Sequence, residues 1–446
     1  MNTPTIHVQY LKTAKLIPSE SNARIHSNQQ LAQLTKCIQE VGFINPIIID
    51  ANNRVIAGHA RLEIAKELNY ETVPVICADF LTEMQIRAYA IADNKLCEQG
   101  EWDQNLLRVE LEFLSQAEID LDIEMTGFQL PEIDLLLQSQ DQSDFDEPDL
   151  PASNPCEENI VQPGDIWDLG SHSIGCGDTR DPEFVNSLIN GHQAHMVFTD
   201  PPYNVPVSGH VSGNGKHQHP EFAMASGEMS EDEFTQFLEN YMSVLKPHCT
   251  PGAVWFTCMD WRHIDNLYQA IELSGGSLLN LIVWNKTSGG MGSLYRSQHE
   301  LITVSKMDNT PHINNVQLGK HGRNRTNVWT YPGMNAFGSE RDEALKTHPT
   351  VKPVAMIAEA IMDVTHRHHI VIDGFLGSGS TLLAAEQTGR HCIGIEIETR
   401  YVALSIKRWQ DYTGKEAIHR ASGLTFNELS KQHASETSKE YDHVQA

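Results

Sequence analysis

The chain has 446 residues, of which 40% are hydrophobic, so it is longer than a typical single domain and can bury more than one core. Its formal net charge of −27 is unusual for a nucleic-acid-binding protein. No Lys or Arg occurs between Arg108 and Arg180, however, so the acidic excess is local. The chain has no apolar stretch of about 18 residues, no signal-peptide pattern and no C-x-x-C pair suited to zinc. We therefore predict a soluble cytoplasmic protein with no membrane segment and no metal.

Residues 1–138 are predicted to form a small α+β domain with a helical extension. Strands are expected up to Asp50, at 55–57 and at 73–77, with a helix from Gly58 to Leu68 and more helices to about residue 115. Gly58 and Arg61 at this strand-to-helix turn could bind a phosphate, although an ordinary helix start is the alternative. The region resembles the ParB-like N-terminal domain. His59 stands where many partition proteins have Glu, which argues against nucleotide hydrolysis.

Residues 139–160 are acidic and rich in Pro and Ser, and they are predicted to be a linker. Cys156 in this segment follows Pro155, as in cytosine-C5 methyltransferases. The neighbouring Glu157 and Glu158 oppose the low thiol pKa that a nucleophile needs, so we reject this interpretation. The tail, residues 421–446, is polar and is predicted to be disordered.

A distinctive motif occurs in the middle of the chain, at Asp200-Pro201-Pro202-Tyr203. It follows an apolar segment, residues 194–198, that is predicted to be a buried strand, and two prolines fix a stiff turn at the strand's carboxyl end. Open α/β sheets bind ligands at that end. The carboxylate and a proline carbonyl can accept the hydrogens of an amine, and the tyrosine ring can stack on a flat group. A base flipped out of DNA presents such an amine, whereas a structural turn with a core tyrosine is the alternative.

Further elements of an α/β sheet are predicted on both sides of this motif. A hairpin is expected over 165–178, a long loop over 207–227, helices over 230–245 and 262–273, and buried strands at 253–257, 281–284 and 301–304. A basic run follows, and we expect its cations to contact DNA phosphates, with a solvated loop as the alternative. These cations are Lys320, Arg323 and Arg325.

A glycine-rich loop from Asp373 to Gly379 joins a predicted strand at 370–372 to a helix. Ser380 replaces the lysine of a phosphate-binding Walker loop, and Leu382 replaces the third glycine of a dinucleotide fingerprint. The next strand ends at Glu396, which is placed to accept hydrogen bonds from ribose hydroxyls. Asp373 can face a positive group, so the pair favours S-adenosyl-L-methionine as cofactor. Glycines that only pack a strand against a helix are the alternative.

The ordered motifs of residues 161–412 resemble the amino-methylating DNA methyltransferases of the β class. They are Asp200 to Tyr203, Tyr295-Arg296 with His299-Glu300, Arg325 to Trp329, His348 to Pro353, Asp373 to Gly379, and Gly394 with Glu396, Tyr401 and Arg408. The resemblance implies a doubly wound α/β methyltransferase sheet over residues 161–420. It assigns catalysis to Asp200, Pro201, Pro202 and Tyr203. It assigns cofactor binding to Asp178, His348, Thr350, Lys352, Asp373, Phe375, Gly377, Ser378, Gly379, Thr381 and Glu396.

The implied reaction is methylation of a flipped adenine at N6 in double-stranded DNA. Family members with Ser in place of Asp200 tend to methylate cytosine N4, so cytosine stays open. In protein or RNA methyltransferases the glycine motif normally comes first, whereas here it follows by about 170 residues. A ParB-like regulator with an inactive methyltransferase domain is a further alternative. Gly374 departs from the proline of many members, and the segment between Val304 and Arg325 is short for target recognition. A homodimer and a cognate restriction nuclease stay open as partners.

Overall fold

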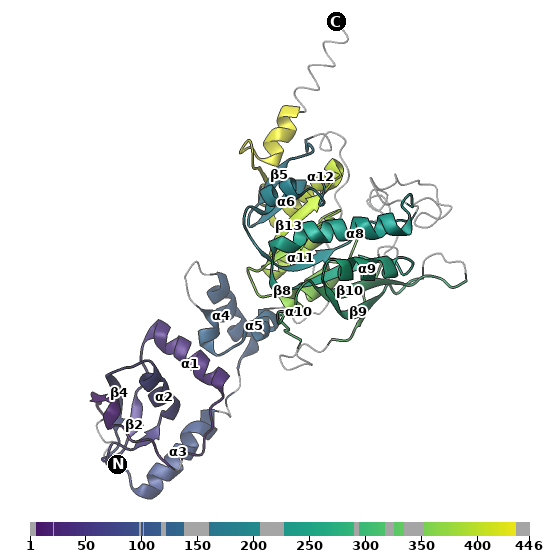
Figure 1. The fold of residues 1–446 in the computed structure, drawn as a ribbon. Helices are drawn as coiled ribbons and strands as arrows, with labels where there is room; N and C mark the ends of the chain where they lie inside the picture. Colours follow the sequence, from purple (N-terminus) through teal and green to yellow (C-terminus); the bar gives the residue numbers. More distant parts are fainter. Residues whose placement is uncertain are drawn as a thin grey trace. The chain divides into compact units, whose positions relative to one another are not determined.

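The computed structural model describes residues 6–20, 22–97, 100, 102–116, 122–137, 160–205, 227–289, 294–316, 325–333 and 351–433 (Figure 1). Contacts divide the chain into two units, Met1–Ser139 and Gln140–Ala446. Several predictions lie outside the described residues. They are the linker up to residue 159 with Cys156, the loop over 207–226, Lys320, Arg323, His348 and Thr350.

The amino-terminal unit contains a four-stranded sheet in the order β1-β4-β2-β3. Its strands are β1 (Val8–Lys12), β2 (Ile47–Ile49), β3 (Val55–Ala57) and β4 (Thr72–Cys77), and its helices are α1 (Asn28–Val41), α2 (His59–Glu67), α3 (Glu83–Cys97), α4 (Gln104–Gln116) and α5 (Leu130–Leu137). The predicted strands and the helix after Gly58 are confirmed. Gly58 has φ of +99°, and a Cβ there would lie 3.0 Å from Arg61 Nη2, so Arg61 folds over the start of its own helix.

The carboxy-terminal unit is built on a sheet whose ten described strands run in the order β11-β9-β10-β8-β7-β12-β13-β6-β5-β14. Their bounds are β5 (Ile166–Leu169), β6 (His172–Cys176), β7 (Ala194–Thr199), β8 (Cys249–Met259), β9 (Ser277–Asn285), β10 (His299–Lys306), β11 (Val328–Thr330), β12 (Ile370–Asp373), β13 (His391–Glu396) and β14 (Ile418–His419). Five neighbouring strands in the middle of the sheet are parallel to one another, in the order β8-β7-β12-β13-β6. Strand β10 is antiparallel to both of its neighbours, β8 and β9. The predicted α/β class is confirmed, with a mixed rather than wholly parallel sheet.

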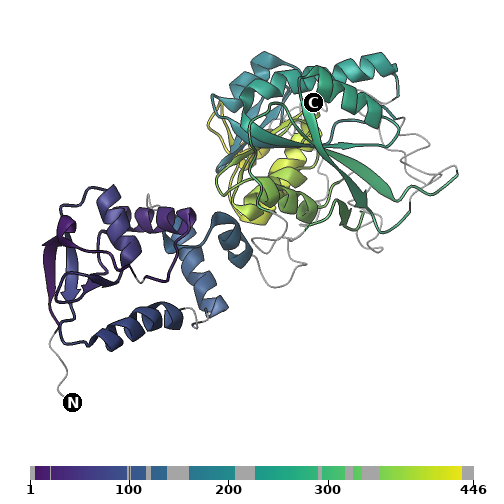
Figure 2. The same ribbon diagram turned by 60° about the horizontal axis from the view of Figure 1, so that its bottom comes forward.

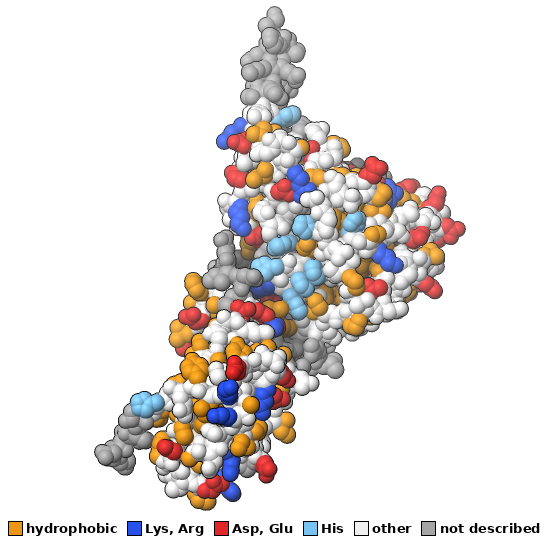
Figure 3. Space-filling view, turned by 60° about the vertical axis from the view of Figure 1, so that its left-hand side comes forward, with side chains coloured by type: hydrophobic (Ala, Val, Ile, Leu, Met, Phe, Trp, Pro, Cys, Tyr) orange, Lys and Arg blue, Asp and Glu red, His pale blue; other side chains and the backbone are white. Residues whose placement is uncertain are grey.

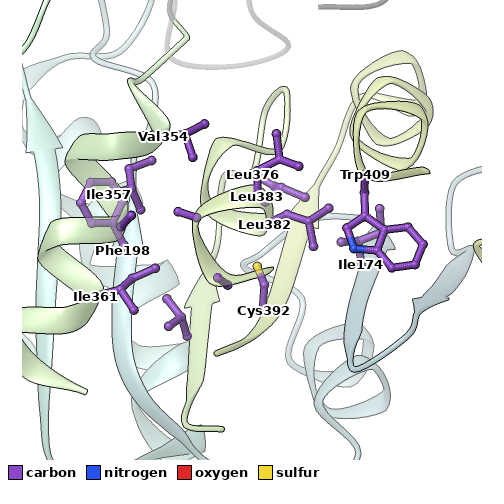
Figure 4. Close-up of a cluster of buried hydrophobic side chains, with 14 of the residues drawn as sticks. Ile174, Phe198, Val354, Ile357, Ile361, Leu376, Leu382, Leu383, Cys392 and Trp409 are labelled. Carbon is purple, nitrogen blue, oxygen red and sulfur yellow. The ribbon is translucent and has the colours of Figure 1, made fainter. Parts of the chain in front are cut away.

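Helices cover both faces of this sheet. One face packs against α6 (Pro182–Ile189), α8 (Glu231–Leu245) and α9 (Ile264–Leu273), and the other against α10 (Val354–Val364), α11 (Ser380–Thr388) and α12 (Thr399–Thr413) (Figure 2). Figure 4 shows the second layer, in which Phe198 of β7 and Cys392 of β13 meet side chains of α10, α11 and α12. Strands such as β7 are buried on both faces, which explains why they read as continuous apolar runs.

The order of the strands creates a switch point between β7 and β12. From β7 the chain continues to β8 on one side, and much later β12 pairs with the other side of β7. Loops that leave neighbouring parallel strands in opposite directions open a crevice at the strands' carboxyl ends. The motif at Asp200 follows β7 and the glycine-rich loop follows β12, so the fold brings together two segments separated by about 170 residues in the sequence.

Two sequence-based expectations are corrected by the fold. The tail was predicted to be disordered from residue 421, but Thr425 forms a β-bridge with Ile418, and Phe426 is buried against Trp167. The packing of Phe426 against the sheet therefore holds this segment in place. The strand at 281–284 was expected to be buried, but only alternate residues of this part of β9 are buried, and residues 277–280 are exposed.

Histidine side chains gather on the surface of the molecule (Figure 3). In the carboxy-terminal unit the rings of His195 and His369 stack with centroids 3.7 Å apart, and His366 lies 5.2 Å from His369. Burial and the neighbouring histidine charges lower the pKa of His369 to about 3, so it is neutral at physiological pH.

Among the described residues, no three His, Cys, Asp or Glu side chains are arranged to hold a metal ion, and no helix is long and apolar enough to cross a membrane.

Candidate active site

A pocket of about 1200 Å³, counting the space at its mouth, opens at the switch point. Four strand ends supply its walls, because β6, β7, β12 and β13 are neighbours in the sheet. Its lining comprises residues 177–179 after β6, residues 200–203 after β7, residues 373–378 and 380–381 after β12, and residues 396–398 after β13, with Val351, Lys352 and Ile357 among others. The structure thus brings both predicted motifs into one cavity.

Asp200 lies in this pocket with both carboxylate oxygens engaged. The hydroxyl of Tyr203 donates to Oδ1 at 2.5 Å, and the ammonium of Lys352 donates to Oδ2 at 2.5 Å. The Asp200 side chain is 20% exposed, whereas that of Lys352 is 6% exposed. Burial raises the pKa of Asp200 even though the charge of Lys352 acts in the other direction. Pro201 and Pro202 line the same pocket.

Lys352, which was predicted to help close the cofactor pocket, lines that pocket, and its ammonium also contacts the catalytic motif. It also lies 3.1 Å from Glu300 Oε2 of β10, and Lys286 is bonded to Glu300 Oε1. Burial would raise the pKa of Glu300, but the charges of Lys352 and Lys286 outweigh it and lower that pKa to about 2. Asp200 and Glu300 in turn raise the pKa of Lys352 against the effect of burial. The four groups therefore form a partly buried set with no net charge.

Glu300 and Lys286 are site residues to which the sequence analysis gave no role. The available signal was a charged residue within a strand, because Glu300 lies in β10 directly before its apolar segment, residues 301–304. Lys286 directly follows β9, which pairs with β10. A charged residue at such a position needs a partner, but the sequence does not say which one.

The tyrosine of the motif is fixed by its hydroxyl group. Besides Asp200, the Tyr203 hydroxyl lies 3.4 Å from Glu300 Oε2, and the ammonium of Lys352 lies 5.5 Å from the ring centroid. Burial and the two carboxylates raise the pKa of Tyr203, so the phenol stays protonated. The next residue, Asn204, has φ of +54°, and its side chain bonds to the backbone of Gly227 and Met229. Asn204 thus ties residues 227–229 to the motif.

Asp373 starts the glycine-rich loop and is held by three donors. Thr199 and the Phe375 backbone N–H donate to Oδ1 at 3.1 and 3.0 Å, and Thr381 donates to Oδ2 at 2.6 Å. Burial nevertheless raises the pKa of Asp373 to about 6. The predicted site residue Thr381 therefore orients Asp373. Similarly, Ser378 is buried and accepts hydrogen bonds from Arg408, while Phe375 packs against Tyr241.

Glu396 ends β13 beside this loop, as the sequence predicted. Its Oε2 accepts from the N–H of Gly377 and its Oε1 from the N–H of Glu398, each at 2.8 Å. Burial raises the pKa of Glu396 to about 7. Each oxygen retains a further acceptor position, and the residue lines the pocket.

The remaining wall offers unpaired polar groups. Asp178 lines the pocket, but its carboxylate also binds Arg180, with Nη2 to Oδ2 at 2.7 Å. Among the described residues, Thr179 Oγ1 and Ser380 Oγ line the pocket and are buried without a hydrogen-bond partner. Such groups are costly unless a ligand satisfies them. The cavity therefore suits a polar ligand with hydroxyl and amino groups.

Arg325, which was predicted to contact DNA, has another role. Its guanidinium pairs with Glu359 at 2.5 Å and with Asp363 at 2.9 Å, both on α10, and it lies over the ring of Trp329. The side chain is 17% exposed. This arrangement contradicts the prediction, because the cation is already neutralised and fixes β11 against α10.

The comparisons with known proteins agree with this geometry. Residues 194–407 match a family model of N6/N4 type that is described as DNA methylase. Residues 194–407 belong to the N6/N4 DNA methyltransferase family. Residues 2–94 match the ParB N-terminal domain, and residues 105–163 match the ParB-methyltransferase HTH domain, which spans the predicted helical extension and linker. The ParB resemblance is therefore confirmed, and the chain acts on DNA.

Curated relatives include the type II methyltransferases M2.LlaDCHI of Lactococcus lactis subsp. cremoris and M2.MboI of Moraxella bovis. The first is 28% identical over an alignment that covers 48% of this chain and 81% of the relative. The second is 25% identical over an alignment that covers 49% of this chain and 81% of the relative. Among solved structures, the PvuII DNA methyltransferase, described as cytosine-N4-specific, aligns with a TM-score of 0.42 and 15% identity, covering 60% of this chain and 92% of its own. Its likeness concerns the fold.

The cofactor of this family is S-adenosyl-L-methionine, and the pocket of the methyltransferase fits it. Glu396 and Asp178 offer acceptors, the N–H groups of the glycine-rich loop offer donors, and Thr179 and Ser380 offer unpaired hydroxyls. These residues would hold the cofactor.

We expect the affinity for S-adenosyl-L-methionine to rise with pH and to level off above about pH 7. Ribose hydroxyls would donate to ionised Glu396, whose pKa in the free protein is about 7, so binding should lower this pKa and release a proton. For a single group the gain cannot exceed about tenfold per pH unit. Calorimetry in buffers of different ionisation enthalpy measures both quantities. Glu396→Gln should abolish the step near pH 7. A wild-type affinity that does not change with pH would contradict this assignment.

Proposed function

We propose that the methyltransferase transfers a methyl group to the exocyclic N6 of an adenine flipped out of double-stranded DNA. The observation that carries this proposal is the carboxylate of Asp200 in the pocket, between the rigid Pro201-Pro202 turn and the glycine-rich loop. Hydrogen bonds from Tyr203 and Lys352 hold the two oxygens of Asp200 in place, so the carboxylate is a fixed acceptor in the pocket.

The chemistry follows from the low nucleophilicity of the amine, whose lone pair is conjugated with the ring of the base. Hydrogen bonds from its two hydrogens to Asp200 and to the Pro201 carbonyl would draw the nitrogen toward a tetrahedral geometry and direct the lone pair into the pocket. The cofactor supplies an electrophilic methyl group. Positioning of the amine supplies much of the rate enhancement. An aromatic amine does not lose a proton to a carboxylate before it is methylated, so Asp200 accepts the proton as the new bond forms.

The choice of adenine rests on the residue at position 200. Members of the β class with Ser at this position tend to act on cytosine, whereas this chain has Asp. The negative charge matters because the methylated amine is cationic until it loses its proton. Asp200 and Glu300 place two carboxylates at this point, and Tyr203 bridges them. These carboxylates would stabilise the methylated amine of either base, so the choice of adenine rests on the Asp at position 200.

The test is methyl transfer from labelled S-adenosyl-L-methionine to unmethylated DNA, followed by digestion to nucleosides and mass spectrometry. The proposal predicts N6-methyladenine as the product, absent with Asp200→Ala. N4-methylcytosine would overturn the choice of base. Cofactor binding without any product would overturn the proposed reaction.

A further inference from the structure

Lys352 is an active-site residue that the proposed reaction does not use. Its ammonium donates to Asp200 Oδ2 at 2.5 Å and to the Tyr203 hydroxyl at 3.1 Å, and it lies 3.1 Å from Glu300 Oε2. It also lies near the rings of Tyr203 and Trp284. A buried ammonium with two carboxylate partners is held in place more firmly than a cation that only closes a loop.

We propose that Lys352 occupies the acceptor oxygen of Asp200 in the DNA-free enzyme and transfers its hydrogen bond to Glu300 when the target amine enters. This inference rests on the proposed function, in which Asp200 accepts the amine. Lys352 is then a positioning residue that acts through Asp200.

The argument begins with competition for one oxygen. The amine and the ammonium of Lys352 are both hydrogen-bond donors, and Tyr203 already donates to the other oxygen of Asp200. Each carboxylate oxygen can accept a second hydrogen bond, but that bond is weaker while an ammonium keeps the first, so the amine binds best if Lys352 weakens its bond to Oδ2. Moving a buried ammonium away from its partner is costly unless a second anion receives it. Glu300 is that anion, at 3.1 Å.

The second step concerns the balance of charge. The set contains two carboxylates, Asp200 and Glu300, and two ammonium groups, Lys286 and Lys352. Its net charge is zero whichever carboxylate Lys352 favours. The other titratable groups that interact with the set are Tyr203 and Cys258, whose raised pKa values keep them neutral, and Asp373, whose oxygens are held by Thr199 and Thr381. The move therefore leaves no buried charge unpaired.

The third step concerns Asp200 before DNA binds. Burial raises the pKa of this carboxyl, and the charge of Lys352 opposes the rise. Without Lys352, Asp200 would take up a proton at higher pH, and a protonated carboxyl is a weaker acceptor for the amine and for the Tyr203 hydroxyl than a carboxylate is. Lys352 therefore keeps Asp200 ionised until the base replaces it.

The experiment uses the full chain, tritiated S-adenosyl-L-methionine and unmethylated plasmid DNA, with kcat and KM measured between pH 5.5 and 9. Lys352→Met should shift the acid limb of the kcat profile upward by at least one pH unit, and Lys352→Arg should restore its position. Glu300→Gln should lower kcat at least tenfold, because Lys352 then has no second anion.

Melting temperatures and calorimetric affinity for the cofactor identify variants that fail to fold. If Lys352→Met does not fold, the kcat profiles of Lys352→Gln and Glu300→Gln are measured in its place. An unshifted acid limb in the Lys352 variants, or wild-type kcat in Glu300→Gln, overturns the inference. The outcomes are distinct from those of the proposed function: a cytosine product would change the base but leave the Lys352 test intact, because either amine needs the same oxygen. Wild-type kcat profiles in the Lys352 and Glu300 variants would overturn the role of Lys352 and would not affect the proposed reaction.

Discussion

Asp200→Asn is expected to lower kcat for DNA methylation by about 10³-fold, the loss typical when a site loses one preorganised charged hydrogen-bond partner. The amide would present an NH2 group either to Lys352 or to Tyr203, both of which are donors to the carboxylate in the wild type. It would also remove the charge that favours the cationic amine. Steady-state transfer of labelled methyl groups measures the effect. Cofactor affinity should change by less than about twofold, because Asp200 does not bond to the glycine-rich loop or to Glu396.

Asp260→Asn is a matched control for this substitution. Asp260 directly follows β8, as Asp200 directly follows the neighbouring β7, and it is ion-paired with Arg262 at 3.0 Å. Its side chain is 21% exposed, close to the 20% of Asp200, but it is not part of the pocket lining. We expect kcat within about twofold of the wild type, since this ion pair lies outside the pocket lining and its arginine is largely exposed. A folded Asp200→Asn variant that keeps a tenth of wild-type activity would rule out the central role of Asp200.

The core of the active site was predictable because it depends on local patterns and one rule of sheet geometry. Apolar runs end at Thr199, at Asp373 and at Glu396, and each is followed by a turn. Neighbouring parallel strands bring their carboxyl ends to one edge of the sheet. Once β7, β12 and β13 are neighbours, Asp200, Asp373 and Glu396 must lie near one another, as the structure confirms.

The charged set around Glu300 could not be predicted, because its contacts join residues far apart in the sequence. Lys352 meets Asp200 across 152 positions, and no spacing connects them. The same limitation explains the error at Arg325, whose partners Glu359 and Asp363 lie on α10. A basic run looks the same in sequence whether its cations face phosphates or carboxylates. The direction of β10 was also not predictable, because buried parallel and antiparallel strands have similar apolar runs.

Gly379→Ala is expected to lower the free energy of unfolding by about 2–4 kcal/mol. Gly379 begins α11 with φ of +85°, a left-handed conformation that costs a residue with a Cβ roughly 1–2 kcal/mol. A Cβ there would lie 2.9 Å from Ser405 Oγ and 3.0 Å from Ser405 Cβ. Ser405 is fully buried on α12, and its hydroxyl donates to the Gly377 carbonyl at 2.9 Å, so it cannot move without disturbing the loop. Urea unfolding followed by tryptophan fluorescence measures the change.

The same substitution should weaken cofactor binding at least tenfold, because Gly377, whose carbonyl Ser405 holds, also donates its N–H to Glu396. Gly414→Ala separates the cost of the left-handed backbone conformation from the cost of the contact between the added Cβ and Ser405. Gly414 has φ of +69°, and a Cβ there would meet no atom within 4 Å. It should lose only the backbone contribution, about 1–2 kcal/mol, and keep wild-type affinity for the cofactor. Equal losses of stability in the two variants would show that the loop yields to the added Cβ. Full cofactor affinity in Gly379→Ala would show that the contact between α12 and the loop does not shape the pocket.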